Sequence, residues 1–160
     1  MDLRQVFDDL VRFETVLWGA LDQRLRRECG VTLGSLNVMM VIDSTPQCRV
    51  YDIAAALAIT VGGTSQAVDR LQAAGWCRRR PNPEDRRSSI LELTDDGTAL
   101  LANAGPVFDG ELDRFLSAPL SATDLAQLGA ALGKVRRAAI NTGSDHPITT
   151  PRAPSTGTDP

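Results

Sequence analysis

Residues 50–97 constrain the possible fold more than any other stretch of the chain. Their pattern predicts a short helix, a turn, a second helix, and then two strands joined by an arginine-rich loop. This is the order of a winged helix-turn-helix, in which one helix enters the major groove of DNA and a β-hairpin, the wing, lies beside it. The sequence therefore predicts a mainly α fold with a small β-hairpin wing.

Composition and charge agree with a small helical protein that binds nucleic acid. A chain of 160 residues, of which 42% are hydrophobic and only 4% aromatic, can bury one core, and helix-forming residues dominate it. The net charge of −3 by itself argues against nucleic acid. Residues 49–94, however, hold seven arginines against five acids, a local charge of +2, and leave −5 on the remainder. A basic stripe on an acidic body is typical of DNA-binding proteins.

The first helix of the helix-turn-helix is expected at residues 53–58, with Asp52 as its N-cap, after a short third strand at residues 48–51. It would cross the DNA backbone without reading bases. The second helix should begin after Thr60, a residue suited to N-capping, and end before Gly75, its C-terminal stop. Its place in the motif makes it the recognition helix.

Two glycines in the first turn of the recognition helix are unexpected, because each costs about 1 kcal/mol of helix propensity relative to alanine. Either bare backbone must approach DNA closely there, or the first turn is frayed and has no role. Gln66 is suited to a bidentate contact with adenine, and Arg70 to a phosphate. The predicted DNA contacts on this helix are Thr60, Gly62, Gly63, Thr64, Ser65, Gln66 and Arg70.

The wing is predicted as two strands, residues 76–80 and 88–93, around a loop that carries two prolines and therefore cannot pair. Three consecutive arginines, Arg78 to Arg80, lie on the first strand and could also be an ordinary solvated charge run. Alternation in the second strand directs Ile90, and either Leu91 or Leu93, toward the core. A protruding basic hairpin is the expected result.

Three motifs in this stretch resemble the MarR family of bacterial regulators, namely DRLQAAG, RRPNPEDRR and LELTDDG. The resemblance implies a homodimeric transcriptional regulator on a pseudo-palindromic double-stranded DNA operator, with repression as the expected output. It also implies release by a small-molecule effector bound between dimerisation helices and winged domain. In the D-x-R part of the second motif, Asp85 would brace the loop and Arg87 would enter the minor groove. Arg86 would point elsewhere and affect affinity less.

Apolar residues at three-four spacing predict further helices on both sides of the motif. One covers residues 3–29, a second covers residues 33–44, and two more follow residue 97. The resemblance implies that the second lies beneath the winged domain. Gly105-Pro106 should interrupt and kink the first of the two helices after residue 97, and Ser121 with Asp124 forms a capping box before the last. Together these helices carry more apolar surface than one small winged domain needs, which implies a dimer.

The expected domain organisation follows from these elements. Residues 1–30 and 98–140 form a helical dimerisation region, and residues 31–97 form the winged helix-turn-helix domain. Residues 141–160 are rich in proline, threonine and glycine without an apolar stripe, so we expect a disordered tail.

One acid interrupts the apolar stripe of the first helix. Glu14 lies seven residues from Phe7 and four from Trp18. The simpler interpretation is a carboxylate at the margin of the stripe, either paired with an arginine or solvated. The functional interpretation is an effector pocket in which Glu14 and Trp18 favour a cationic or hydrogen-bond-donating ligand.

Other function classes find little support in the sequence. With His146 as the only histidine and no nucleophile elbow, P-loop or paired carboxylates, we expect no enzyme, no cofactor and no metal site. No apolar run is long enough to span a membrane and the N-terminus lacks the order of a signal peptide, so a cytoplasmic protein is expected. Two alternatives stay open: redox sensing through Cys29 or Cys48, and a winged helix retained for protein contacts.

Overall fold

A computed structural model of the chain describes residues 2–142. Its elements are α1 (Leu3–Cys29), α2 (Leu33–Ser44), α3 (Val50–Leu57), α4 (Val61–Ala73), β1 (Cys77–Pro81), β2 (Ser89–Leu93), α5 (Asp95–Leu112), the π-helical turn η1 (Asp113–Ser117) and α6 (Ala122–Thr142). The predicted disordered tail lies outside the described residues, apart from residues 141 and 142, which are helical and end α6. Within residues 2–142, no helix combines the length and the apolar character needed to cross a membrane.

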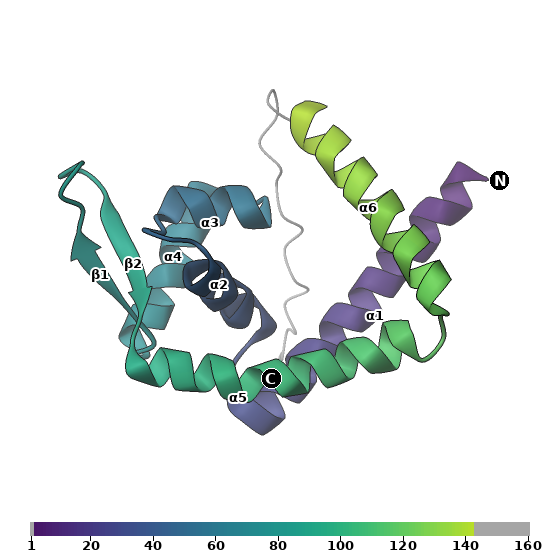
Figure 1. Cartoon of the computed structure of the whole chain (residues 1–160), viewed down its shortest axis with the longest axis horizontal. Coiled ribbons are helices and arrows are strands. Elements are labelled where there is room, and N and C mark those ends of the chain that lie inside the picture. The colour runs from purple at the N-terminus through teal and green to yellow at the C-terminus, as the bar shows by residue number, and fades with distance from the viewer. Residues whose placement is uncertain (1, 143–160) are drawn as a thin grey trace, which may run out of the picture.

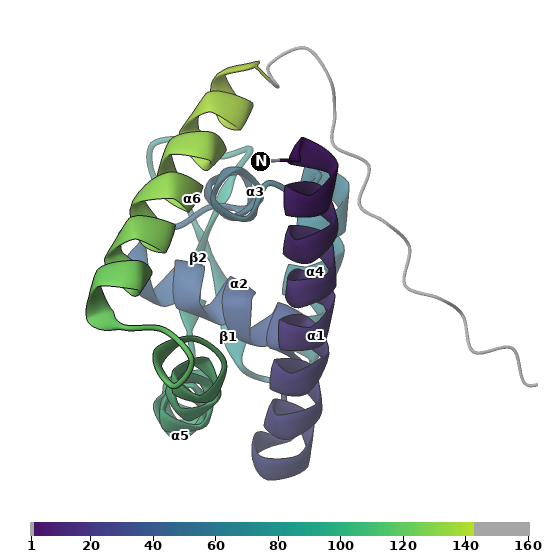
Figure 2. The same cartoon turned by 90° about the vertical axis from the view of Figure 1, so that its right-hand side faces the viewer.

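The helix α5 connects two regions of the molecule (Figure 1). The winged region, made of α2 to α4 and the hairpin of β1 and β2, lies on one side, while α1 and α6 extend on the other. α5 runs beneath both, from the base of the hairpin toward the start of α6. The view turned by 90° shows α1 and α6 standing on opposite sides (Figure 2). The predicted fold class, mainly α with a two-stranded wing and N- and C-terminal helices, is confirmed.

The core lies where the C-terminal half of α1 meets α2, the helix-turn-helix and the hairpin. Leu25, Met39 and Ile53, from three different helices, are fully buried in it. α1 ends as predicted, because Gly30 adopts the left-handed conformation (φ 68°) and its N–H donates to the Arg26 carbonyl. This stop lets the chain turn directly into α2.

The remainder of α1 and much of α6 leave their apolar faces uncovered in the single chain. Phe7 is 68% exposed and Val135 is 66% exposed. We call this the α1/α6 surface; its exposed large apolar residues are Leu3, Val6, Phe7, Leu10, Val11, Phe13, Val16, Trp18, Leu128, Leu132 and Val135. An apolar area of this extent is characteristic of a surface that contacts another protein chain.

The strand predicted at residues 48–51 is wrong. α3 begins at Val50, its N-cap is Arg49 in place of Asp52, and Asp52 occupies the third helical position. The Asp52 carboxylate accepts a hydrogen bond from the Arg49 N–H (2.8 Å), which takes that N–H away from any neighbouring strand. One strand-like contact remains, because the Leu91 N–H donates to the Cys48 carbonyl (2.7 Å).

The interruption predicted at Gly105-Pro106 is also wrong, because α5 continues through Pro106 to Leu112. The proline removes one helical hydrogen bond. This part of the helix is nevertheless packed onto the core, through buried Ala104 and half-buried Phe108. The capping box before α6 is confirmed. Ser121 Oγ donates to Asp124 (2.6 Å), while the N–H of each residue donates to the other's side chain.

Candidate nucleic-acid interface

The recognition helix is α4, and its predicted ends are confirmed. Thr60 caps it, because the Thr60 hydroxyl accepts a hydrogen bond from the Gly63 N–H (3.1 Å). Gly75 follows the helix in the left-handed conformation (φ 78°), which reverses the chain into β1. Val68 and Leu71 are buried beneath α4, so its opposite face is free to meet a ligand.

Most of the predicted contact residues lie on that free face. Thr60, Gly62, Gly63, Gln66 and Arg70 are exposed. Ser65 is half-buried.

The placement of Thr64 in the groove is wrong. Thr64 is 0% exposed, and its hydroxyl donates to the Thr60 carbonyl (2.9 Å). Positions four and seven residues further along are buried Val68 and Leu71, so the helical repeat places Thr64 on the core face. Its hydroxyl is satisfied within the helix and is not available to DNA.

The two glycines of the first turn differ in what surrounds them. A Cβ built on Gly63 would lie 3.1 Å from the Thr60 hydroxyl oxygen, so a side chain there would crowd the cap. A Cβ built on Gly62 would meet nothing within 4 Å. Packing within the described chain therefore gives a reason for glycine at position 63 and none at position 62.

The wing forms the predicted antiparallel hairpin, in which Arg79 pairs with Leu91 and Arg80 with Ile90. Ile90 and Leu91 are both 2% exposed, so the second strand is anchored in the core. The first strand begins one residue later than expected and includes Pro81, opposite Ser89.

The three arginines of β1 are held by acids of the same chain. Arg78 and Arg80 both pair with Glu92 (3.1 and 2.8 Å). Their hydrogen bonds lower the pKa of the Glu92 carboxyl, with the larger effect from Arg80 and the smaller from Arg78. Arg79 donates to Asp69 and Gln72 of α4. The arginines therefore brace the hairpin and tie it to the recognition helix, and are not merely a solvated run.

The arginines at the tip of the wing differ from those of β1 in their hydrogen-bond and ion-pair partners. Arg86 and Arg87 are exposed, and neither guanidinium makes a hydrogen bond or ion pair within residues 2–142. Asp85 braces the loop as predicted, because its carboxylate accepts a hydrogen bond from the Arg87 N–H (3.0 Å). The tip thus presents two free cations on a fixed backbone.

A cleft of about 410 Å³ lies between the wing and the helix-turn-helix. Arg49 and Tyr51 line it from the start of α3, Val61 from α4, and Arg79 and Arg87 from the wing. Tyr51 is 71% exposed, so its side chain is accessible from solvent. Arg49 and Tyr51 were not among the predicted contacts, because the sequence pattern indicated a strand at both positions.

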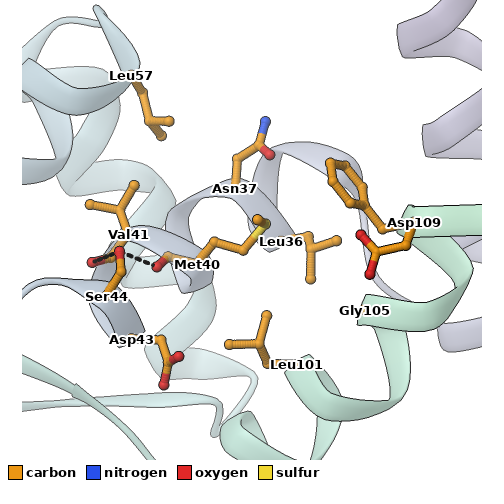
Figure 3. Close-up of a pocket in the computed structure, with 11 residues that line it drawn as sticks. Leu36, Asn37, Met40, Val41, Asp43, Ser44, Leu57, Leu101, Gly105 and Asp109 are labelled. Carbon is orange, nitrogen blue, oxygen red and sulfur yellow. Dashed lines mark hydrogen bonds between the residues drawn. The ribbon is translucent and has the colours of Figure 1, made fainter. Parts of the chain in front are cut away.

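A second, mostly apolar cavity of about 580 Å³ lies between α2 and α5, with Leu57 of α3 at its edge (Figure 3). Three of its polar residues, Asn37, Asp43 and Asp109, are drawn in that view. Glu14 and Trp18 do not line this cavity, and both are exposed on α1. The effector pocket predicted at Glu14 and Trp18 stays a prediction, because the described single chain leaves both side chains facing solvent.

Comparison with known proteins identifies the group to which this fold belongs. A family model described as MarR family matches residues 31–89. The multiple antibiotic resistance protein MarR of Salmonella typhimurium is 31% identical over 105 residues, which cover 66% of this chain and 73% of that protein. The chain belongs to the MarR family.

Membership makes this protein a MarR-family DNA-binding transcriptional regulator and not an enzyme. Two solved structures are similar to it over most of their length. A MarR family transcriptional regulator from Streptomyces coelicolor, in complex with DNA, has a TM-score of 0.83 and 25% identity, and the match covers 90% of this chain and 91% of that one. CouR from Rhodococcus jostii, bound to p-coumaroyl-CoA, shares the fold, with a TM-score of 0.72 and 22% identity. The match covers 79% of this chain and 87% of CouR.

The thiols of this MarR-family chain are poorly suited to redox sensing. Cys48 is 0% exposed, and desolvation, followed by the nearby Asp52 charge, raises its pKa to about 11. Desolvation also raises the pKa of buried Cys77. Because the thiolate is the species that reacts with oxidants, both should be inert near neutral pH. Cys29, which is half-buried, is the remaining candidate.

We expect a variant with all three cysteines changed to serine to bind DNA as the wild type does, with and without peroxide treatment. Gel shifts before and after treatment measure this. Loss of DNA binding by oxidised wild type alone would establish thiol sensing instead.

Proposed function

We propose that this regulator binds a pseudo-palindromic operator as a homodimer in the cytoplasm, represses transcription there, and is released by a small-molecule effector. The proposal of a homodimer rests on the uncovered α1/α6 surface, where Phe7, Trp18 and Val135 are each at least 45% exposed. A two-fold dimer contributes two recognition helices, which fit half-sites about one helical turn apart. Burying the α1/α6 surface against its copy would remove this apolar area from water.

The proposed DNA contacts divide between two grooves. The exposed face of α4 would lie in the major groove, with Gln66 reading a base edge and Arg70 holding a phosphate. The wing would lie over the adjacent minor groove, with Arg87 inserted, Asp85 bracing it and Arg86 outside. The similar Streptomyces coelicolor regulator was solved in complex with DNA, which supports DNA binding by this fold. The proposed contacts on α4 are Thr60, Gly62, Gly63, Ser65, Gln66 and Arg70.

The effector would occupy the cavity between α2 and α5, in place of the pocket first expected at Glu14 and Trp18. Its apolar walls suit a hydrophobic or aromatic body, and the carboxylates of Asp43 and Asp109 suit a cationic or hydrogen-bond-donating group. Neither carboxylate has a hydrogen-bond partner in the described part of the chain. The relative bound to p-coumaroyl-CoA supports small-molecule binding by this fold.

The decisive experiment combines light scattering with gel shifts on DNA that flanks the gene. A dimer that needs two half-sites is the expected result. The proposal fails if a stable monomer binds one half-site with full affinity.

Gly62 provides a prediction in which stability and DNA binding change in opposite directions. Gly62→Ala should stabilise the fold by up to about 1 kcal/mol, because the added methyl group meets no other atom and alanine favours the helix. The same methyl group would stand between α4 and the groove, and should weaken operator binding by about 1 kcal/mol or more. Thermal unfolding and binding titrations measure the two effects.

Gly34 is a matched control for this experiment. It occupies the second helical position of α2 behind a capping threonine, as Gly62 does in α4, and a Cβ there also meets nothing within 4 Å. Gly34→Ala should stabilise the fold to a similar degree and leave DNA binding unchanged. Equal DNA binding by both variants would show that α4 does not approach DNA through Gly62.

A further inference from the structure

One polar side chain of the wing is buried although every residue between it and Ser88 is exposed. Asn82 is 6% exposed, whereas Pro83 to Arg87 all face solvent. Asn82 is not part of the hydrophobic core, so apolar packing does not explain why it is buried. Burying an amide is unfavourable unless its hydrogen bonds are made, so these bonds indicate what the residue does.

The hydrogen bonds of Asn82 close the loop that carries the tip. Its carbonyl oxygen accepts from the Glu84 N–H (3.0 Å), and its amide NH₂ donates to the Ser88 hydroxyl (2.9 Å). The Ser88 hydroxyl in turn donates to the Asp85 carbonyl (3.2 Å), which also accepts from the Ser88 N–H (3.1 Å). Asn82 therefore joins the two ends of the loop through one continuous network.

Arg87 lies between the two fixed points of this network. On one side, its own N–H is held by the Asp85 carboxylate (3.0 Å). On the other, Ser88 is held by Asn82 and by the Asp85 carbonyl. The backbone around Arg87 is thus held from both sides, while its guanidinium makes no hydrogen bond or ion pair within residues 2–142.

We infer that Asn82 is a positioning residue for Arg87, which holds the wing tip in the conformation that inserts this arginine into DNA. This inference rests on the proposed placement of Arg87 in the minor groove. A loop fixed before binding loses less conformational entropy when DNA arrives, so its arginine binds more tightly than the same arginine on a mobile loop. Asparagine suits the position because one side chain supplies both the acceptor for Glu84 and the donor for Ser88.

A double-mutant cycle tests the inference on the full-length protein and its operator. The variants are Asn82→Ala, Arg87→Ala and the double variant, each titrated across a range of salt concentrations on operators with A·T or G·C pairs under the wing. Asn82→Ala should weaken binding about three- to tenfold, the size expected for the loss of one hydrogen-bonded link. It should also reduce the preference for A·T pairs. The double variant should bind no more weakly than Arg87→Ala, because Asn82 acts through Arg87.

A second variant tests the same hydrogen-bonded link in case Asn82→Ala folds poorly. Ser88→Ala removes the other end of the same link from a half-buried position, and should reproduce the loss of A·T preference even if Asn82→Ala folds poorly. Additive effects of Asn82→Ala and Arg87→Ala, or an unchanged A·T preference in Asn82→Ala and Ser88→Ala, would overturn the inference while leaving the groove contact intact. If Arg87→Ala itself binds as the wild type does, the proposed groove contact and this inference fail together.

Discussion

Replacing Arg87 by alanine should weaken operator binding by about 1–3 kcal/mol per half-site. The guanidinium is exposed and has no hydrogen-bond or ion-pair partner within residues 2–142, on a loop whose backbone is fixed by the Asp85 carboxylate. A slender planar cation suits the narrow minor groove of A·T-rich DNA, where negative potential is concentrated. The salt dependence of binding should therefore fall by about one phosphate contact, and the preference for A·T pairs under the wing should flatten.

Two variants separate this contact from its neighbours. Arg86→Ala removes the adjacent exposed arginine and should affect affinity less, because the proposal places only Arg87 in the groove. Gln66→Ala should relax the choice of base at one major-groove position and leave the salt dependence nearly unchanged. If the Arg87→Ala protein binds like the wild type throughout a salt titration, the wing does not enter the groove.

Gly97→Ala should destabilise the fold by about 3 kcal/mol, the upper end of the usual range for overpacking. Gly97 is buried in the first turn of α5, and a Cβ there would collide with the backbone carbonyl of Trp76. That carbonyl already accepts a hydrogen bond from the Thr94 N–H (3.1 Å), so it is not free to move away. Because a backbone group cannot change rotamer, the helix or the start of β1 must shift.

Gly105, in the same helix, provides the comparison. Beyond its chain neighbours a Cβ there meets nothing within 4 Å, but Gly105 precedes Pro106, whose ring disfavours the helical conformation of a residue that carries a Cβ. Gly105→Ala should therefore destabilise the fold less than Gly97→Ala does. Thermal unfolding at one fixed protein concentration measures both variants, since the stability of a dimer depends on concentration. Equal stabilities for Gly97→Ala and wild type would show that α5 does not pack against Trp76 as closely as described.

The elements that could be predicted from sequence are those determined by neighbouring residues. Thr60 and Gly75 mark the ends of α4 because capping and the left-handed stop depend on local backbone geometry. The hairpin could be predicted because its loop residues cannot continue a strand, although the burial of both Ile90 and Leu91 departs from simple alternation. The glycine of the LELTDDG motif was part of the family resemblance, but its physical reason, contact with Trp76, required three-dimensional packing.

The wrong predictions have different causes. Residues 48–51 have the composition of a strand, but the Asp52 carboxylate competes for the Arg49 N–H and starts a helix early. Thr64 has a side chain suited to DNA, yet the phase of α4 relative to the core turns it inward. The α2/α5 cavity depends on how two helices lie against each other, and no spacing within either helix predicts that. Burial relative to other elements is not encoded in local patterns.

Because α5 continues through Pro106, a movement of one of its ends can be transmitted to the other end. One end begins at Asp95, two residues beyond β2, and the other carries Gly105 and Asp109 in the wall of the cavity. The fifteen residues from Asp95 to Asp109 span about 20 Å at about 1.5 Å per residue, so a tilt of about 5° displaces one end by about 2 Å relative to the other. A ligand that wedges α5 away from α2 would transmit that displacement to the base of the wing without unfolding any element. A flexible break at Pro106 would absorb the motion before it reached DNA.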